Sequence, residues 1–88
     1  MKLSKQKRDK ITEQLLAYLY SISPKQVFTI NIAQELARDE EFVKSLLLEL
    51  KRKKLVVEIN KNPKGILYKR RLRWQLTDSA YQTYKNHQ

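Results

Sequence analysis

Basic side chains gather in one stretch of the chain, where their spacing could neutralise a row of phosphate groups. Residues 51–73 hold ten lysines and arginines against a single acidic residue, Glu58, which gives the stretch a net charge of +9 (10 − 1). The whole chain of 88 residues carries +10, so most of the excess is concentrated here. Segregated positive charge indicates a polyanionic partner, whereas interspersed signs would indicate an ordinary solvated surface.

The second half of this stretch has the pattern of a hairpin with cations on one face. Residues 66–76 are apolar at most even positions, so the odd positions face the other way. Residues 62–65 have the composition of a type I turn, and about five phosphate contacts would give a log–log salt slope near −4 to −5. The candidate phosphate-binding residues are Lys61, Lys64, Lys69, Arg71 and Arg73, with Arg70 on the opposite face.

The turn also predicts how the two strands of this hairpin pair. Closing it on residues 62–65 sets the strand at 55–59 against 66–76 in the pairs Ile59–Tyr68, Val57–Arg70 and Leu55–Leu72. Glu58 then lies opposite Lys69, so the alternative to phosphate binding is a solvated hairpin with a cross-strand ion pair. In this register Trp74 and Leu76 extend past the partner strand and can pair with a short strand at 27–30.

The chain offers little material for catalysis. It has no cysteine and one histidine, His87, beside the last residue, so no metal-binding cluster has the required spacing. A single glycine cannot build a glycine-rich phosphate loop, and Glu40 with Glu41 suits a helix dipole better than an acid–base pair. We therefore predict that the protein is not an enzyme and has no cofactor, no metal site and no evident small-molecule ligand.

Apolar spacing and capping residues predict the helices that must position the hairpin. Apolar residues three and four apart indicate a first helix over 4–21, with Ser4 as its N-cap. Asn31 is expected to cap a second helix, with Gln34 three residues later completing a capping box. Thr77 is expected to cap a last helix that ends near residue 85.

A third helix is expected over residues 40–53, with Asp39 as its N-cap, and its residues divide into two faces. The inward, core-facing residues are Phe42, Val43, Leu46, Leu47 and Leu50. The outward residues are Glu41, Lys44, Ser45, Leu48 and Arg52. The aromatic residues Phe28, Tyr68, Trp74, Tyr81 and Tyr84 are assigned to the core rather than to a base-stacking surface.

These elements make one α+β domain over residues 1–88, in the order helix, strand, helix, helix, strand, turn, strand, helix. Together with the segments IAQELA (32–37), FVKSLLLEL (42–50), KKLV (53–56) and LTDSA (76–80), this order resembles the winged helix-turn-helix superfamily, especially regulators of the MarR, ArsR and PadR type. Two departures are the acidic opening of the third helix and Ala80, where the family often has glycine.

The resemblance implies a transcription regulator that binds double-stranded DNA, with the hairpin as a wing on phosphates. It places major-groove contacts on the outward face of the third helix, at Lys44, Ser45 and Arg52, where Leu48 could meet a thymine methyl or a partner chain. The first and last helices commonly pair between chains in such regulators, so a homodimer is expected as a separate hypothesis. The alternative is a protein-interaction or RNA-binding module that docks onto an acidic partner or ribonucleoprotein, which the acidic helix opening favours.

Two expectations concern the N-terminus and the location of the protein. The cations of residues 1–10 are either a second backbone clamp or a disordered start, with residues 1–5 as a basic arm; they are Lys2, Lys5, Lys7, Arg8 and Lys10. No stretch approaches a transmembrane span, and Glu13 and Gln14 spoil a signal-peptide core. We therefore expect a cytoplasmic protein with no membrane partner.

Overall fold

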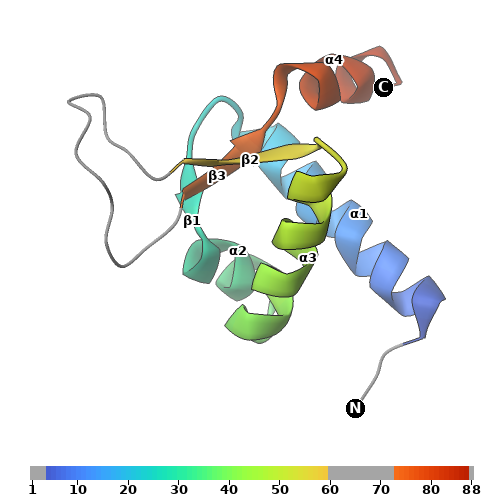
Figure 1. Ribbon diagram of the computed structural model, residues 1–88, viewed down its shortest axis with the longest axis vertical. Helices are drawn as coiled ribbons and strands as arrows, with labels where there is room; N and C mark the ends of the chain where they lie inside the picture. The colour runs from blue at the N-terminus through green and yellow to red at the C-terminus, as the bar shows by residue number, and fades with distance from the viewer. Residues whose placement is uncertain (1–3, 60–72, 88) are drawn as a thin grey trace.

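The computed structural model describes residues 4–59 and 73–87, which form four helices and a three-stranded antiparallel sheet (Figure 1). The strand order is β1-β3-β2. In Figure 1, α3 stands between α2 and α1, and α4 lies beyond the sheet at the opposite end of the molecule from the start of α3. This confirms the predicted α+β class. The elements are α1 (Lys5–Ile22), β1 (Val27–Phe28), α2 (Thr29–Leu36), α3 (Glu40–Arg52), β2 (Val56–Ile59), β3 (Arg73–Leu76) and α4 (Asp78–Asn86).

Three helices begin at the predicted N-caps, because each has a side-chain oxygen that accepts a backbone N–H otherwise left without a helical partner. Ser4 Oγ accepts from the N–H of Lys7 at 3.3 Å. Asp39 Oδ2 accepts from the N–H of Phe42 at 3.2 Å, and Thr77 Oγ1 accepts from the N–H of Ala80 at 3.2 Å. These short sequence signals therefore determine where α1, α3 and α4 start.

The prediction that Asn31 caps the second helix is wrong, and so is the capping box with Gln34. Helix α2 begins at Thr29, and Asn31 is its third residue, whose Oδ1 accepts the N–H of Phe28 at 3.1 Å. The asparagine thus satisfies the helix start from inside the first turn. The expected strand at 27–30 is shortened to two residues because Thr29 belongs to the helix.

The core lies where α1, α2 and α3 meet the inner face of the sheet. Trp74 of β3 is completely buried, and its Nε1–H donates to Thr29 Oγ1 at 2.8 Å. Burying side chains of this size contributes about 1.5–3 kcal/mol each. The predicted inward residues of α3 are confirmed: Val43, Leu46, Leu47 and Leu50 are buried, and Phe42 packs against them while partly exposed.

The predicted hairpin register is wrong. Val57 pairs with Gln75 rather than with Arg70, a shift of five residues (75 − 70), and Glu58 lies opposite Trp74 rather than Lys69. An odd shift turns the strand over, so Val56 and Glu58 face inward with Trp74, while Val57 is exposed. The observed register places Trp74 and Leu76 in the core. The turn predicted at 62–65 lies outside the described residues.

One part of the predicted pairing is confirmed. Trp74 pairs with Val27 of β1 on one side and with Glu58 of β2 on the other, so β3 is the central strand. Leu76 pairs with Val56 rather than with β1. The inward alternation of Trp74 and Leu76 is as predicted, because both are buried.

Candidate nucleic-acid interface

The outward face of α3 carries four exposed residues in a line, which we call the outward stripe. They recur every three or four residues, the spacing of one helix face. Their exposure is the one predicted from the sequence, and the exposed fraction of the apolar member, Leu48, is 44%. The adjacent Lys44 is also exposed. The outward stripe consists of Glu41, Ser45, Leu48 and Arg52.

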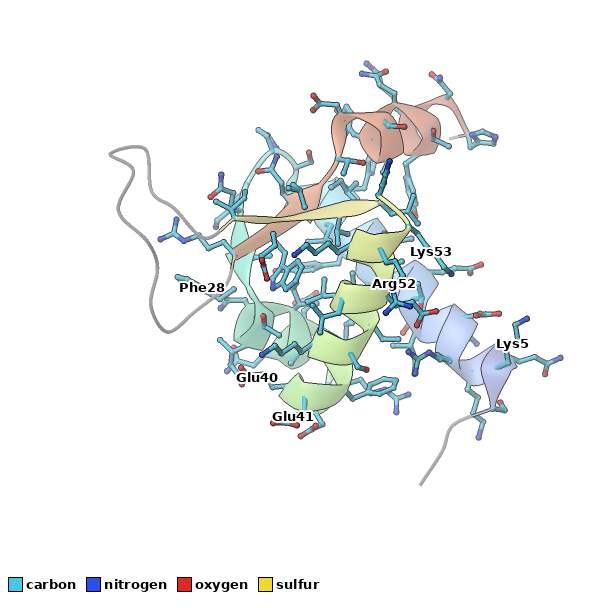
Figure 2. All side chains as sticks on the ribbon, in the orientation of Figure 1. Lys5, Phe28, Glu40, Glu41, Arg52 and Lys53 are labelled. Atoms are coloured by element: carbon cyan, nitrogen blue, oxygen red, sulfur yellow. The ribbon has the colours of Figure 1, made fainter. Side chains whose placement is uncertain are left out.

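Charge changes sign along α3. Asp39, Glu40 and Glu41 stand at its start, and four consecutive basic residues, 51–54, stand at its end. Figure 2 shows Glu40 and Glu41 at one end of the helix and Arg52 with Lys53 at the other. Both groups suit the helix dipole. A phosphate backbone would therefore be repelled at the start of α3 and attracted at its end.

Two of the four cations at the end of α3 are held by carboxylates. Lys51 Nζ lies 3.2 Å from Glu58 Oε2 of β2, and Lys53 Nζ lies 3.7 Å from Glu49 Oε1. Within the described ranges 4–59 and 73–87, Arg52 takes part in no ion pair. Arg52 is also the basic member of the outward stripe, so its guanidinium is available to a ligand.

The N-terminal cations that the structure describes belong to α1 rather than to an extended segment. Lys5 is the first residue of the helix, as Figure 2 shows. Arg8 Nη2 donates to Glu49 Oε2 of α3 at 2.6 Å, and the guanidinium lies 6.0 Å from the centre of the Phe42 ring. The hydrogen bond and positive charge of Arg8, followed by the charge of Lys53, lower the pKa of Glu49 below its ordinary 4.5. Arg8 therefore ties α1 to α3.

At the base of the hairpin, Arg73 opens β3 directly opposite Phe28 of β1. Its guanidinium carbon lies 4.9 Å from the centre of the Phe28 ring, a cation–π contact. Arg73 and Gln75 are on the opposite sheet face from Trp74, as predicted. The other hairpin candidates, Lys61, Lys64, Lys69, Arg70 and Arg71, lie outside the described residues, as does Tyr68.

The second feature of the surface is an apolar groove of about 300 Å³ between α1 and α4. Leu16 of α1, Tyr84 of α4, Leu55 and Leu76 are among the residues that line it. The Tyr20 ring packs against the rings of Tyr81 and Tyr84, with centroids 5.2 and 4.7 Å away. Sequence reasoning missed this groove, because it depends on how α4 sits against α1, which no local pattern shows.

Other kinds of site find little support in the part of the chain that the structure describes. It holds no group of three or more His, Cys, Asp or Glu residues able to bind a metal ion. His87 Nδ1 lies 2.7 Å from the carbonyl oxygen of Thr83, within the last turn of the chain. Between residues 4 and 59 and between 73 and 87, no helix combines the length and apolar character needed to cross a bilayer.

Comparison with known proteins relates this arrangement to transcription regulators. No protein-family model matches the chain, and no curated protein does. Among solved structures, Staphylococcus aureus MepR, described as a regulator of the multidrug efflux pump MepA, superposes with a TM-score of 0.70 at 26% identity, covering 92% of this chain and 59% of MepR. A MepR–DNA complex gives 0.68 at 29% identity, covering 94% and 71%. Lactococcus lactis ZitR gives 0.70 at 22% identity, covering 99% and 51%.

These neighbours are MarR-family transcription regulators with the winged-helix fold. The fold predicted from the sequence is confirmed: the chain has a winged helix-turn-helix, with α2 and α3 as the helix pair and β2 and β3 as the hairpin strands. The chain spans between half and three-fifths of the first solved structures it matches.

Proposed function

We propose that this chain binds double-stranded DNA as part of a transcription regulator, with α3 in the major groove and the wing on backbone phosphates. The observation that carries the proposal is the likeness, over 94% of the chain, to MepR in its complex with DNA. The exposed outward stripe supports it, because the second helix of a helix-turn-helix, here α3, presents its outward face to the duplex.

The wing is the connection between β2 and β3, and its composition supports phosphate binding. Residues 60–72 contain five basic residues and no acidic one. Each phosphate that a cation neutralises releases counterions, which lowers the log–log salt slope by about 0.9. The proposed phosphate-binding residues of the hairpin are Lys61, Lys64, Lys69, Arg70, Arg71 and Arg73, and the proposed major-groove residues of α3 are Lys44, Ser45 and Arg52.

The test removes charge from the wing without disturbing the sheet. Lys69→Ala with Arg71→Ala avoids Arg73, whose guanidinium packs on Phe28. We expect weaker binding to a labelled duplex and a salt slope flatter by roughly two, since each lost contact removes about 0.9. Unchanged affinity would overturn the assignment of phosphate contacts to the wing.

A matched control removes the same charge from elsewhere. Lys25 and Lys85 are exposed, one before β1 and the other on α4. Replacing both with alanine lowers the net charge by the same two units, so binding that depends only on total charge would weaken equally. We expect this control to retain most of the salt slope.

A second candidate is a module that docks onto RNA or an acidic protein. The exposed Glu40 and Glu41 at the start of α3 favour it, because they oppose the entry of this helix between the phosphate backbones of a DNA groove. Duplex DNA, single-stranded DNA and RNA are titrated separately at low and high salt. Tightest binding to the duplex supports the proposed function. Absence of duplex binding even at low salt would favour the second candidate.

Self-association is a separate proposal, and the apolar groove between α1 and α4 supports it. Exposed apolar surface of this kind is a common feature of protein interfaces, and Leu16 of α1 and Tyr84 of α4 both line it. Light scattering should give the mass of a dimer, and Leu16→Glu should reduce it to that of a monomer. A monomer mass for the unaltered chain would contradict the proposal.

A further inference from the structure

We propose that the outward stripe of α3 selects base pairs by three different chemistries. Arg52 prefers guanine, Leu48 prefers thymine and Glu41 prefers cytosine, in that order from the end of the helix to its start. This inference rests on the proposed function, because it requires α3 to enter the major groove of a duplex.

The length of the stripe matches a short binding site. Glu41 and Arg52 are eleven residues apart (52 − 41), which is about 16 Å along a helix that rises 1.5 Å per residue. Base pairs are stacked about 3.4 Å apart, so a stripe of this length, inclined to the duplex axis in the groove, spans at most about five of them. Leu48 lies about two base pairs from Arg52 and about three from Glu41 on the same scale.

Arg52 is the member best suited to guanine. Its neighbours Lys51 and Lys53 are held by Glu58 and Glu49, whereas Arg52 is exposed and forms no ion pair among residues 4–59 and 73–87. A planar guanidinium can donate two parallel hydrogen bonds to O6 and N7 of guanine. An alanine at the same place could donate to neither atom, whereas a lysine could still reach both.

Leu48 is an apolar residue on an otherwise polar line. Its exposed fraction of 44% leaves the side chain in water in the free protein. In the major groove the apolar feature is the C5 methyl group of thymine, so contact between the two would remove both from water. Ser45, between Leu48 and Glu41, donates its hydroxyl to the carbonyl oxygen of Phe42 at 2.6 Å, so it can only accept from a base edge and adds little selectivity.

Glu41 supplies selection by exclusion as well as by contact. A carboxylate only accepts hydrogen bonds, and cytosine N4 offers it a donor in the major groove. Opposite guanine O6 and N7, which are both acceptors, the carboxylate loses its water without gaining a hydrogen bond. Glu40 lies about 100° away around the helix, outside the stripe, so it provides a matched charge for comparison.

The experiment is selection of bound sequences from a random duplex library with the unaltered chain and four variants. The unaltered chain should enrich guanine, thymine and cytosine within about five base pairs. Arg52→Ala should reduce the guanine preference by roughly 5- to 150-fold, the range that one bidentate contact provides. Leu48→Ala should lose the thymine preference, and Glu41→Gln should shift cytosine toward adenine, which an amide recognises.

Glu40→Gln is the control, and it should leave all three preferences unchanged. Duplex binding without any enriched sequence would overturn this inference and leave the proposed function standing. Enriched sites that are unchanged in Arg52→Ala and in Leu48→Ala would also overturn it, because another surface would then select the bases. Absence of binding to any duplex would overturn the proposed function and this inference with it.

Discussion

Leu47 and Leu48 are neighbours in α3, yet they meet opposite surroundings. Leu47 is fully buried, whereas 44% of Leu48 is exposed. Each residue turns the helix by about 100°, so one leucine faces α1, α2 and the sheet while the next faces solvent. The inward face must fit a close-packed core. The outward face has no such constraint, so its chemistry can change without loss of the fold.

The sharpest test of this comparison is the same substitution at both leucines. Leu47→Ala should lower the free energy of unfolding by about 2–5 kcal/mol, because it removes buried methyl groups and leaves a cavity. Leu48→Ala should change it by less than about 0.5 kcal/mol, as exposed substitutions generally do. Urea unfolding gives both values. Equal losses would show that Leu48 is covered by another surface in solution.

A second test concerns the buried hydrogen bond that Trp74 of β3 donates to Thr29 of α2. Thr29→Val keeps the shape of the side chain but leaves the buried Trp74 Nε1–H without its acceptor. We expect a loss of about 1–3 kcal/mol in the free energy of unfolding, the desolvation cost of a buried donor. Thr29→Ser retains the hydroxyl and should lose less. A larger loss for Thr29→Ser than for Thr29→Val would mean that the methyl group, not the hydrogen bond, stabilises the junction.

A third test addresses the start of α3, where the outward stripe begins. Asp39→Ala removes the oxygen that accepts the N–H of Phe42, and it should cost about 0.5–2 kcal/mol in thermal or urea unfolding. Asp39→Asn retains an oxygen at this position and should restore most of the loss. If both variants lose the same amount, the charge of Asp39 on the helix dipole is the stabilising factor.

The sequence predicted the two faces of α3 because the signal is local. Apolar residues three and four apart, with Asp39 as a cap, are enough to identify Leu46 and Leu47 as inward and Arg52 as outward. The winged-helix fold followed from the order of such elements, and it required no contact between distant residues to be known.

The hairpin register could not be predicted in the same way. The turn signal at 62–65 is local, but the pairing of Val57 with Gln75 depends on burying Trp74 against Thr29, 45 residues away. The inward position of Glu58, next to Lys51, follows from that pairing. Periodicity within one strand does not carry this information, because the partner strand sets which face is buried.

The candidate interface shows the same limit. Lys44, Ser45 and Arg52 could be selected from helix geometry alone, and all three are exposed. The pair of Lys53 with Glu49, four residues apart on one helix, is a local pattern. The pairing of Lys51 with Glu58 of β2 could not be foreseen, nor could the contact between Arg8 and Glu49, which joins residues 41 apart. A cation's availability to a ligand therefore depends on tertiary neighbours rather than on charge in the sequence.

The smallest effect is expected at Glu49, on the border between the two faces of α3. Its hydrogen bond from Arg8 lowers the pKa of this carboxyl below 4.5, so the folded chain binds the proton less readily than the unfolded chain. The resulting stabilisation is present above about pH 4.5 and is lost as the pH falls through the lowered pKa. Glu49→Gln should therefore be less stable than the unaltered chain at neutral pH, and this difference in the free energy of unfolding should shrink in acid.

An NMR titration of the Glu49 carboxyl carbon measures this pKa directly. Arg8→Met should raise the pKa toward its ordinary value, since the Arg8 hydrogen bond is the largest cause of the shift. Lys53→Met should raise it less, because this lysine lies 3.7 Å away and contributes less. Equal pKa values for the unaltered chain and the Arg8 variant would show that the bridge between α1 and α3 does not persist in solution. Arg8 would then be as available to a polyanion as Arg52.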